Sequence, residues 1–275
     1  MIGPSPYATP AQRLWRALFL MFCAGVLLFL ILPILAIVPL SFNEAAFLTY
    51  PIPGWSLRWF RAFLNSDMWL LSVKNSLIVA FATTVLATVL GTLAALGLTR
   101  ASFPGKALVM ALLISPMIVP LVITAVAMYF LFSRVNLVNS YSGLILAHTV
   151  LAAPFVVITV TSSLQGFDRT LARAGASLGA PPVTVFFRVT LPLILPGVVS
   201  GALFAFATSF DEVVVALFLA GPEQRTLPRQ MFSGIRENIS PTIAAVATLL
   251  IVVAVLLLMA LELLRRRAER LRAGR

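Results

Sequence analysis

Long apolar runs alternate with short polar segments along the chain, and this alternation predicts helices that cross a membrane. An α-helix needs about 20 consecutive apolar residues to cross the hydrocarbon core of a bilayer. Six runs meet this requirement. They cover residues 17–40, 76–98, 107–132, 143–164, 191–220 and 241–264. The first run exceeds the about 7–15 residues of a signal-peptide core, so we expect it to remain as an uncleaved first span.

The composition supports a membrane protein. Hydrophobic residues make up 60% of the 275 residues and charged residues 11%, with a mean hydropathy of +1.03. Soluble domains are about 45–50% apolar and about 25% charged. We therefore predict an all-α membrane protein with six transmembrane helices, in which residues 1–275 form a single transmembrane domain with no soluble domain. The single cysteine, Cys23, allows no intrachain disulfide.

The net charge of +11 alone could indicate nucleic acid or anionic lipid as a partner. The placement of the basic residues favours a topological role instead, because Lys and Arg resist translocation. With six spans, both termini lie on one side, and that side collects 13 of the 20 basic residues. The sequence therefore predicts a multi-pass protein of a bacterial cytoplasmic (inner) membrane, with both termini in the cytoplasm. It predicts the lipid bilayer as a partner and no nucleic acid.

Two segments add detail to this plan. Residues 41–71 mix aromatic and basic side chains, which predicts an interfacial segment ending in a short amphipathic helix; a plain solvated loop is the alternative. The third span contains Pro116 and Pro120, and proline permits kinks in membrane helices. A kinked helix beside a moving pathway and static packing are both compatible with this pattern.

A cytoplasmic loop over residues 168–190 separates the fourth and fifth spans. Residues 170–178 read as a short helix, and Gly179 can take a backbone conformation that sets a sharp turn. Pro181 and Pro182 suit the first turn of a second helix, where amide hydrogens have no helical partner. The loop therefore has two rigid arms, the short helices on either side of Gly179. Such a rigid loop is typical of an element that transmits a movement from one subunit to another.

The residues of this loop resemble the E-A-A loop of binding-protein-dependent ABC importer permeases. The matching positions are Leu178-Gly179-Ala180, Phe186, Arg188-Val189-Thr190-Leu191-Pro192, Pro196-Gly197 and Gly201. The resemblance implies the six-helix fold of ABC type I importer permeases. It also implies that the loop is a coupling helix that docks on a cytoplasmic ATPase. The implied coupling residues are Arg173, Ala174, Gly175, Leu178, Gly179, Ala180, Pro181 and Phe186.

One position departs from the family pattern. The Glu-Ala-Ala of the family falls on Arg173-Ala174-Gly175, so the usual acidic residue is basic here. This departure predicts an acidic or neutral position opposite Arg173 on the ATPase. The alternative is that residues 168–190 are merely an amphipathic connecting loop.

A second resemblance narrows the substrate. Ser209-Phe210-Asp211-Glu212-Val213-Val214-Val215, Thr226-Leu227-Pro228, Ser240-Pro241, Asn75-Ser76-Leu77 and Gly91-Thr92 are similar to positions in permeases of spermidine/putrescine importers. The resemblance implies import of a small cationic solute, a polyamine of the spermidine/putrescine type. An opine or another amino-acid derivative is the alternative substrate.

Two adjacent carboxylates, Asp211 and Glu212, lie within the predicted fifth span. Acidic residues inside a membrane usually face a cavity, a partner or an ion path. Neighbouring residues of a helix point about 100° apart, so at most one of the two faces a narrow pathway. The resemblance favours Asp211, with Glu212 and Phe210 beside it; a structural ion pair is the alternative. His148 reads either as a proton relay or as hydrogen-bonded packing.

The sequence predicts a transport subunit and no enzyme. It contains no Walker-type glycine loop, so the chain cannot hydrolyse ATP by that chemistry, and no Cys/His cluster predicts a metal site. By the resemblance, this chain binds no cofactor, and ATP and Mg²⁺ belong to the ATPases. The implied partners are a second permease, two cytoplasmic ATPases and an external solute-binding protein. An ion-driven secondary transporter is a rival, although no internal repeat is visible. A membrane anchor for a signalling complex would leave the carboxylates unexplained.

Overall fold

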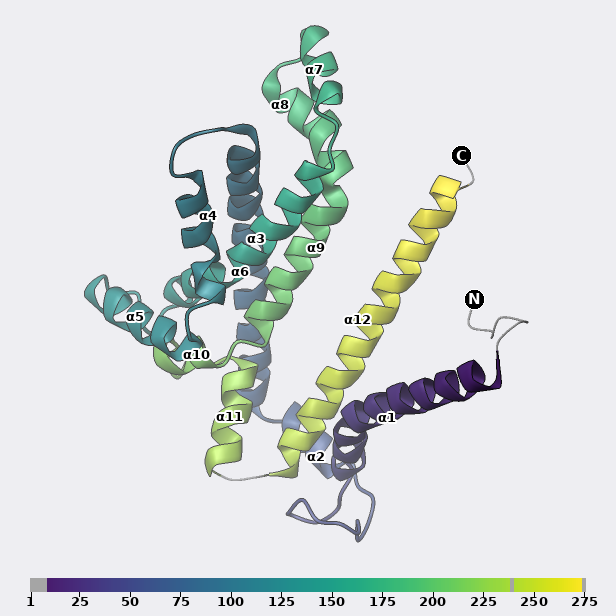
Figure 1. Ribbon diagram of the computed structural model, residues 1–275. Coiled ribbons are helices and arrows are strands. Elements are labelled where there is room, and N and C mark those ends of the chain that lie inside the picture. The colour runs from purple at the N-terminus through teal and green to yellow at the C-terminus, as the bar shows by residue number, and fades with distance from the viewer. Residues whose placement is uncertain (1–8, 238–239, 274–275) are drawn as a thin grey trace. The chain divides into compact units, whose positions relative to one another are not determined.

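The computed structural model describes residues 9–237 and 240–273, and their elements are helices joined by turns and one isolated antiparallel bridge, Asn43 to Trp55 (Figure 1). The elements are α1 (Pro10–Leu40), α2 (Arg58–Leu64), α3 (Asp67–Arg100), α4 (Lys106–Ile114), the 3₁₀ turn η1 (Ser115–Met117), α5 (Leu121–Arg134), α6 (Tyr141–Gln165), α7 (Arg169–Ser177), α8 (Pro182–Val185), the π-helix η2 (Phe186–Thr190), α9 (Leu191–Phe210), α10 (Val214–Leu219), α11 (Leu227–Glu237) and α12 (Pro241–Ala273). The predicted all-α class is confirmed.

The number of full-length spans is smaller than the predicted six. Within the described residues, four helices are long and apolar enough to cross a membrane: α1, α3, α6 and the continuous helical stretch Pro182–Phe210. A fifth arises if α4 with η1 and α5 count as one span, although the two halves are bent by 101°. The apolar described part of α12, Pro241–Leu256, is shorter than these four. The predicted third span, 107–132, is therefore a broken helix and not a continuous one.

The chain divides into two compact units, Met1–Ser66 with Gly234–Arg275 (the first unit) and Asp67–Ser233 (the second unit). In the first unit, α12 packs on both α1 and α2. The α1 helix has a capping box at Thr9 and no buried residue, so its apolar side chains face outward all round. Such a helix is stable only in an apolar surrounding.

The interfacial segment of the first unit ends earlier than predicted. The short helix expected there is α2, and the Nε1 of Trp59 donates to the carbonyl oxygen of Asn43 at 2.8 Å. The segment closes at Ser66, because α3 already begins at Asp67. The α3 helix therefore starts nine residues before the predicted second span, and Asp67 lies in its first turn, where the helix dipole favours a carboxylate.

The second unit is built around α3, α6 and α9, which pack against one another. Small residues permit this close approach. A methyl group added at Gly91 of α3 would lie 2.7 Å from Cβ of Val156 on α6, and one added at Gly201 of α9 would lie 3.0 Å from Cα of Val156. Both distances are shorter than side chains tolerate. Glycine is therefore required where these helices meet, as it is at many helix contacts in membranes.

A second cluster of the same unit joins two short apolar helices, α5 and α10, to this core. Ala125 and Met128 of α5 pack with Val215, Ala216 and Leu219 of α10, together with side chains of α3 and α6. The α10 helix follows a break at residues 211–213. The predicted fifth span, 191–220, is therefore wrong as a continuous helix, because its last part is this separate short helix.

Candidate substrate pathway and coupling loop

The break after α9 places the two adjacent carboxylates in different surroundings. The helix ends at Phe210, Asp211 is exposed, and Glu212 is buried with 7% of its surface accessible. Because the pair lies outside a regular helix, the 100° separation expected for helical neighbours does not apply. The irregular backbone at the break instead leaves the side chain of Asp211 exposed and that of Glu212 buried.

Glu212 lies two residues before α10 and bonds to its first turn. Its Oε1 accepts a hydrogen bond from the backbone N–H of Val215 at 2.7 Å, inside the first turn of α10. The first amide groups of a helix lack helical partners, and a side-chain oxygen at this point satisfies one of them. Glu212 is thus held in place by α10, whereas the carboxylate of Asp211 remains open to its surroundings.

Aromatic rings form a row that ends beside Asp211. The rings of Phe206 and Phe210 stack with centroids 5.6 Å apart and planes inclined by 14°. Phe81 of α3 packs on Phe206 at 5.2 Å. Asp211 follows Phe210 in the chain, and a carboxylate attracts a cationic ligand by its charge while aromatic faces attract it by cation–π interaction.

His148 joins α6 to the end of α9. Its Nδ1 lies 2.9 Å from Oγ of Ser209, within hydrogen-bond distance, and both side chains are buried. Its Nε2 has no partner among the described residues. This contact fits the packing interpretation of His148, and Ser209 is held two residues before Asp211.

The segment after α10 is tied to the beginning of α3 by residues of two separate sequence motifs. The Nδ2 of Asn75 donates to the carbonyl oxygens of Glu223 and Arg225 at 2.8 and 2.9 Å. The hydroxyl of Tyr141 donates to Oδ1 of Asn75 at 2.7 Å. The Asn75 side chain is fully buried, so its amide fixes residues 223–225 from within.

Ser76 supplies the neighbouring contact. Its Oγ accepts from the backbone N–H of Leu227 at 2.7 Å, where α11 begins. The Nη1 of Arg229 donates to the carbonyl oxygens of Ala220 and Gly221, and burial lowers the pKa of Arg229 from its ordinary value, with a further contribution from the charge of Arg225. Sequence reasoning recorded the motifs at 75–77 and 226–228 but gave them no role; the structure brings them together.

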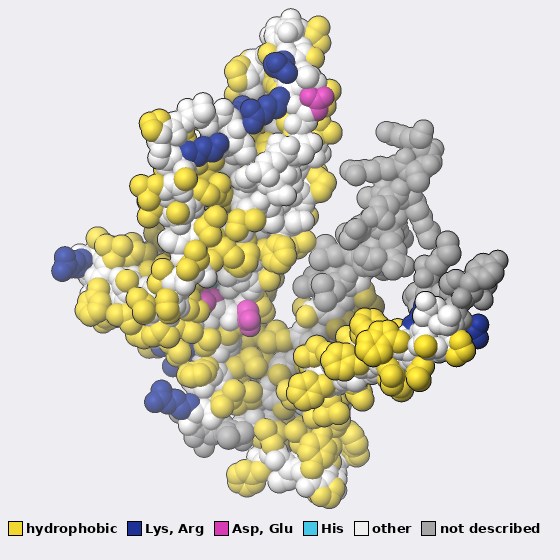
Figure 2. Space-filling model, in the orientation of Figure 1, with side chains coloured by type: hydrophobic (Ala, Val, Ile, Leu, Met, Phe, Trp, Pro, Cys, Tyr) yellow, Lys and Arg dark blue, Asp and Glu magenta, His cyan; other side chains and the backbone are white. Residues whose placement is uncertain are grey.

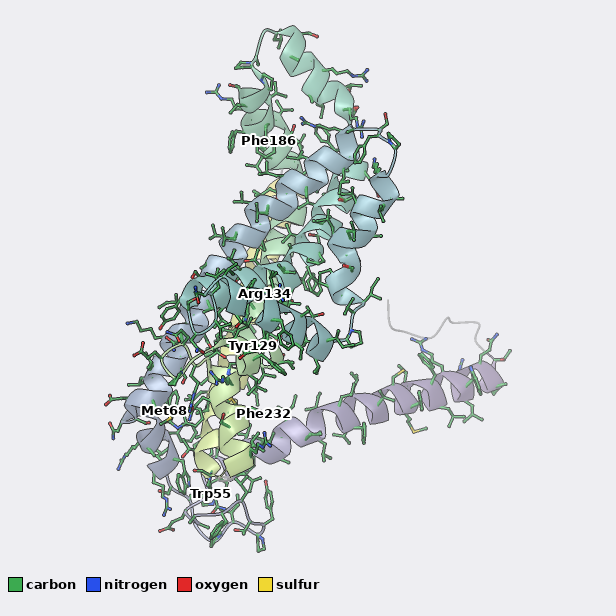
Figure 3. All side chains as sticks on the ribbon, turned by 90° about the vertical axis from the view of Figure 1, so that its left-hand side faces the viewer. Trp55, Met68, Tyr129, Arg134, Phe186 and Phe232 are labelled. Carbon is green, nitrogen blue, oxygen red and sulfur yellow. The ribbon has the colours of Figure 1, made fainter. Side chains whose placement is uncertain are left out.

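The predicted coupling loop, residues 168–190, which is called the coupling loop below, lies at the other end of the second unit, beyond the end of α9 that is far from α10 (Figure 1). In Figure 3, Phe186 marks this end and Met68 the opposite one. The α7 helix is capped by Asp168, whose Oδ1 accepts from the N–H of Thr170 at 2.8 Å. This contact holds the pKa of Asp168 below its ordinary value. The Nη2 of Arg169 donates to the carbonyl oxygen of Thr99 at 2.7 Å and so ties the loop to the last turn of α3.

The turn between the two arms has the predicted geometry. Gly179 has φ of 82°, in the left-handed region, and Pro181 and Pro182 begin α8. The second arm continues through the π-helix η2, where the rings of Phe186 and Phe187 meet edge to face at 5.0 Å. The arms are therefore short helices around one glycine turn, as the sequence predicted.

The loop exposes its tip and buries its base. Leu178 is 88% accessible at the turn, and Arg173 and Ala174 are exposed on α7. Gly175 lies against Val185, which is buried, and a methyl group added at Gly175 would lie 3.4 Å from Val185 Cγ2. Gly175 stands where the family has its second alanine, and the space around it would accept the methyl group of an alanine.

Comparison with known proteins decides the family. Residues 87–270 match the family model of the binding-protein-dependent transport system inner membrane component, a stretch that contains both the coupling loop and the break at 211–213. The chain belongs to this permease family.

Relatives of the permease are similar over most of their length. It is 35% identical to the spermidine/putrescine transport system permease protein PotC of Haemophilus influenzae over 240 residues, which are 87% of this chain and 93% of PotC. It is 36% identical to the putrescine transport system permease protein PotI of Escherichia coli over 230 residues, 81% of this chain and 82% of PotI.

Solved structures show the same fold. A chain of a bacterial ABC transporter that imports the acidic polysaccharide alginate matches the permease with a TM-score of 0.74, at 12% identity, over 95% of this chain and 99% of the other. A chain from the alginate transporter in complex with its periplasmic protein matches with a TM-score of 0.70 at 17% identity. The permease is therefore a multi-pass membrane protein with the fold of an ABC importer permease.

The predicted site residues of the permease fall into two groups. The coupling residues of 173–186 lie together around the turn at Gly179, and Phe210, Asp211 and Glu212 lie together at the end of α9. The two groups are at opposite ends of α9. The α9 helix connects the two groups, and the α3 and α6 helices pack on it.

Proposed function

We propose that this permease is one of two non-identical membrane subunits of an ATP-driven importer, and that it moves a polyamine of the spermidine/putrescine class. The observation that carries the proposal is the exposed carboxylate of Asp211, which follows the stacked rings of Phe206 and Phe210. A polyamine presents ammonium groups separated by methylene chains, so it matches carboxylate and aromatic faces together. The names of PotC and PotI support this substrate class.

The proposed partners follow from the family. An external solute-binding protein delivers the substrate, and two cytoplasmic ATPases hold ATP and Mg²⁺, so this chain itself needs no cofactor. A second permease subunit completes the pathway. Residues 1–275 act as one transmembrane domain with both termini in the cytoplasm, in keeping with the excess of basic residues on that side.

The coupling loop is the proposed docking element. Its exposed tip at Leu178 enters a groove of the ATPase, and the two short arms carry the movement of the ATPase to α9. The exposed guanidinium of Arg173 faces an acidic or neutral position of the ATPase, opposite in sign to the family pattern. Arg173→Glu is therefore expected to abolish stimulation of the ATPase, whereas Arg173→Lys retains it.

Uptake of labelled spermidine and putrescine into proteoliposomes that contain the whole complex tests the substrate. Asp211→Asn removes the charge and keeps the shape, and it should raise the KM for uptake about tenfold or more, since a charge pair at 4 Å contributes about 1–4 kcal/mol between water and a partly dry site. Asp67→Asn, an exposed carboxylate in the first turn of α3, is the matched control and should leave uptake unchanged.

Two outcomes contradict the proposal. Uptake of an amino-acid derivative such as an opine, with polyamines ignored, would replace the substrate class. Uptake driven by an ion gradient without ATP would replace the importer class.

A further inference from the structure

A cavity of about 650 Å³ lies where the coupling loop meets the ends of α3 and α6. Three arginines line it: Arg100 at the end of α3, and Arg169 and Arg173 on α7. Figure 2 shows basic side chains gathered over this end of the second unit. The described residues that line the cavity include no carboxylate.

The basic groups are partly fixed before any ligand arrives. The guanidinium of Arg169 is held by its hydrogen bond to the carbonyl oxygen of Thr99, and Thr99 itself lines the cavity. The nearest acidic residue along the chain, Asp168, uses one oxygen to cap α7. Three positive charges and one negative charge leave a local excess of positive charge, which a ligand of opposite sign would neutralise.

An unused hydroxyl points to the same kind of ligand. Thr190 lines the cavity, is fully buried, and its Oγ1 has no hydrogen-bond partner among the described residues. Leaving a buried polar group unpaired costs about 1–3 kcal/mol. A ligand oxygen that reaches this hydroxyl, once the side chains that cover it move apart, would accept from it and remove that cost.

The remaining walls are apolar. Leu164, Phe167 and Val185 line the cavity alongside the arginines. Leu164 is the penultimate residue of α6 and Arg100 the last of α3, and both helices are long and apolar enough to cross a membrane. Headgroups of a bilayer lie at the level where such helices end. The cavity thus lies at the level of the headgroups, and its walls are partly charged and partly apolar.

We propose that this cavity binds the phosphate group of an anionic phospholipid. The planar guanidinium fork matches two phosphate oxygens, the hydroxyl of Thr190 donates to a third, and the apolar walls receive the glycerol and the first methylenes of the acyl chains. Basic pockets between membrane helices bind anionic headgroups in this way. The proposal rests on the helices spanning a membrane, which the family establishes, and not on the transported substrate.

The tip of the coupling loop leaves the cavity available for lipid. Leu178, the most exposed large apolar side chain of the loop, does not line the cavity. Arg173 and Ala180 belong both to the cavity lining and to the predicted coupling residues, so the ATPase and the lipid meet at this edge, while Arg100, Arg169 and Thr190 remain for the lipid. A bound lipid would brace the base of the loop against α3 and α6, so the loop would move with these helices.

Titration of the delipidated full-length permease complex with phosphatidylglycerol, followed by native mass spectrometry, tests the proposal. Each arginine near a membrane surface contributes enough to change the affinity about fivefold, so Arg100→Gln should weaken phosphatidylglycerol binding by about that factor. Thr190→Val keeps the shape of the side chain and removes only the hydroxyl, and it should also weaken binding. Arg188→Gln is the matched control, because Arg188 belongs to the same loop, is exposed and does not line the cavity.

The result expected is weaker binding in the first two variants, wild-type binding in the control, and no preference for phosphatidylcholine at this site. Wild-type affinity in both Arg100→Gln and Thr190→Val would overturn the proposal. Displacement of the lipid by millimolar inorganic phosphate would show a site for free phosphate instead, and expulsion of the lipid by the ATPases would show a protein occupant. The readout is bound lipid, so a failure of the polyamine proposal in the uptake assay leaves it unaffected.

Discussion

The side-chain amide of Asn75 donates to the carbonyl oxygen of Glu223 at 2.8 Å, although 148 residues separate the two. This contact fixes the segment between α10 and α11 to the beginning of α3. The same amide reaches Arg225, and its oxygen accepts from Tyr141. One buried side chain thus holds three partners that come from two distant parts of the sequence.

Asn75→Ala should strongly destabilise the second unit. The substitution removes the two hydrogen bonds to the carbonyl oxygens and the one from Tyr141, whose hydroxyl keeps only its 3.3 Å contact with the carbonyl oxygen of Glu223. Each lost hydrogen bond costs about 0.5–1.5 kcal/mol, and about 1–3 kcal/mol where water cannot reach the group left behind. Tyr141→Phe removes one of these bonds and should cost less. Thermal unfolding of the purified permease in detergent measures both, and equal losses in the two variants would contradict the central role of Asn75.

Gly197→Ala should destabilise the contact between α6 and α9. The added methyl group would lie 2.8 Å from Cβ of Ser163 and 2.9 Å from the carbonyl oxygen of Thr159, and overpacking of this kind costs about 1–3 kcal/mol. Gly97→Ala is the control, because Gly97 lies within α3 with nothing within 4 Å of the added group. That control should be neutral or stabilising by about 0.5–1 kcal/mol. A similar fall in the unfolding temperature of both variants would contradict crowding at Gly197 as the cause.

Two glycines of the coupling loop should respond in opposite directions to alanine. Gly175 lies in a helix and the added methyl group makes ordinary contact with Val185, so Gly175→Ala should stabilise α7 by about 0.5–1 kcal/mol. Gly179 has φ of 82°, a conformation that costs other residues about 1–2 kcal/mol, so Gly179→Ala should loosen the turn. Amide hydrogen exchange of α7 and α8 reports both effects, and protection that rises in both variants would exclude strain at Gly179.

The cap of α7 should weaken at low pH. The N–H of Thr170 holds the pKa of Asp168 below its ordinary value of 3.8. A lowered pKa in the folded state stabilises the helix above pH 3.8, and this contribution is lost as the pH falls through the lowered value. Amide exchange of residues 169–172, corrected for the intrinsic rate, should therefore accelerate below pH 3.8. Asp168→Asn keeps a capping oxygen without a titrating group and should abolish this pH dependence.

Sequence reasoning predicted those parts of the fold that depend on local chemistry. The lengths of the apolar runs predicted α1, α3 and α6, and the glycine and proline positions at 179–182 predicted the two-armed loop. These features are determined by neighbours in the chain. Asp211 and Glu212 were singled out as carboxylates within an apolar run, and the resemblance favoured Asp211; its place in a substrate pathway stays a prediction.

The breaks at 118–120 and 211–213 were harder to foresee. Residues 213–220 are apolar and continue the run of the fifth span, so hydropathy alone gives no sign that α9 ends at Phe210. The end is produced by the hydrogen bond from Val215 to Glu212 and by the packing of α10 in the core. Pro116 and Pro120 indicated a kink in the third span, but the bend of 101° depends on where α5 packs.

The packing of α5 on α10 has a mechanical consequence. Side chains of these two short helices pack together, and each helix is joined to the preceding helix through a break in the chain: α5 to α4 at 118–120, α10 to α9 at 211–213. Movement of the chain at one break is therefore coupled to movement at the other break through the packed α5 and α10 helices. A rotation of α10 that changes the surroundings of Asp211 should therefore be accompanied by a matching rotation of α5 beside Pro120.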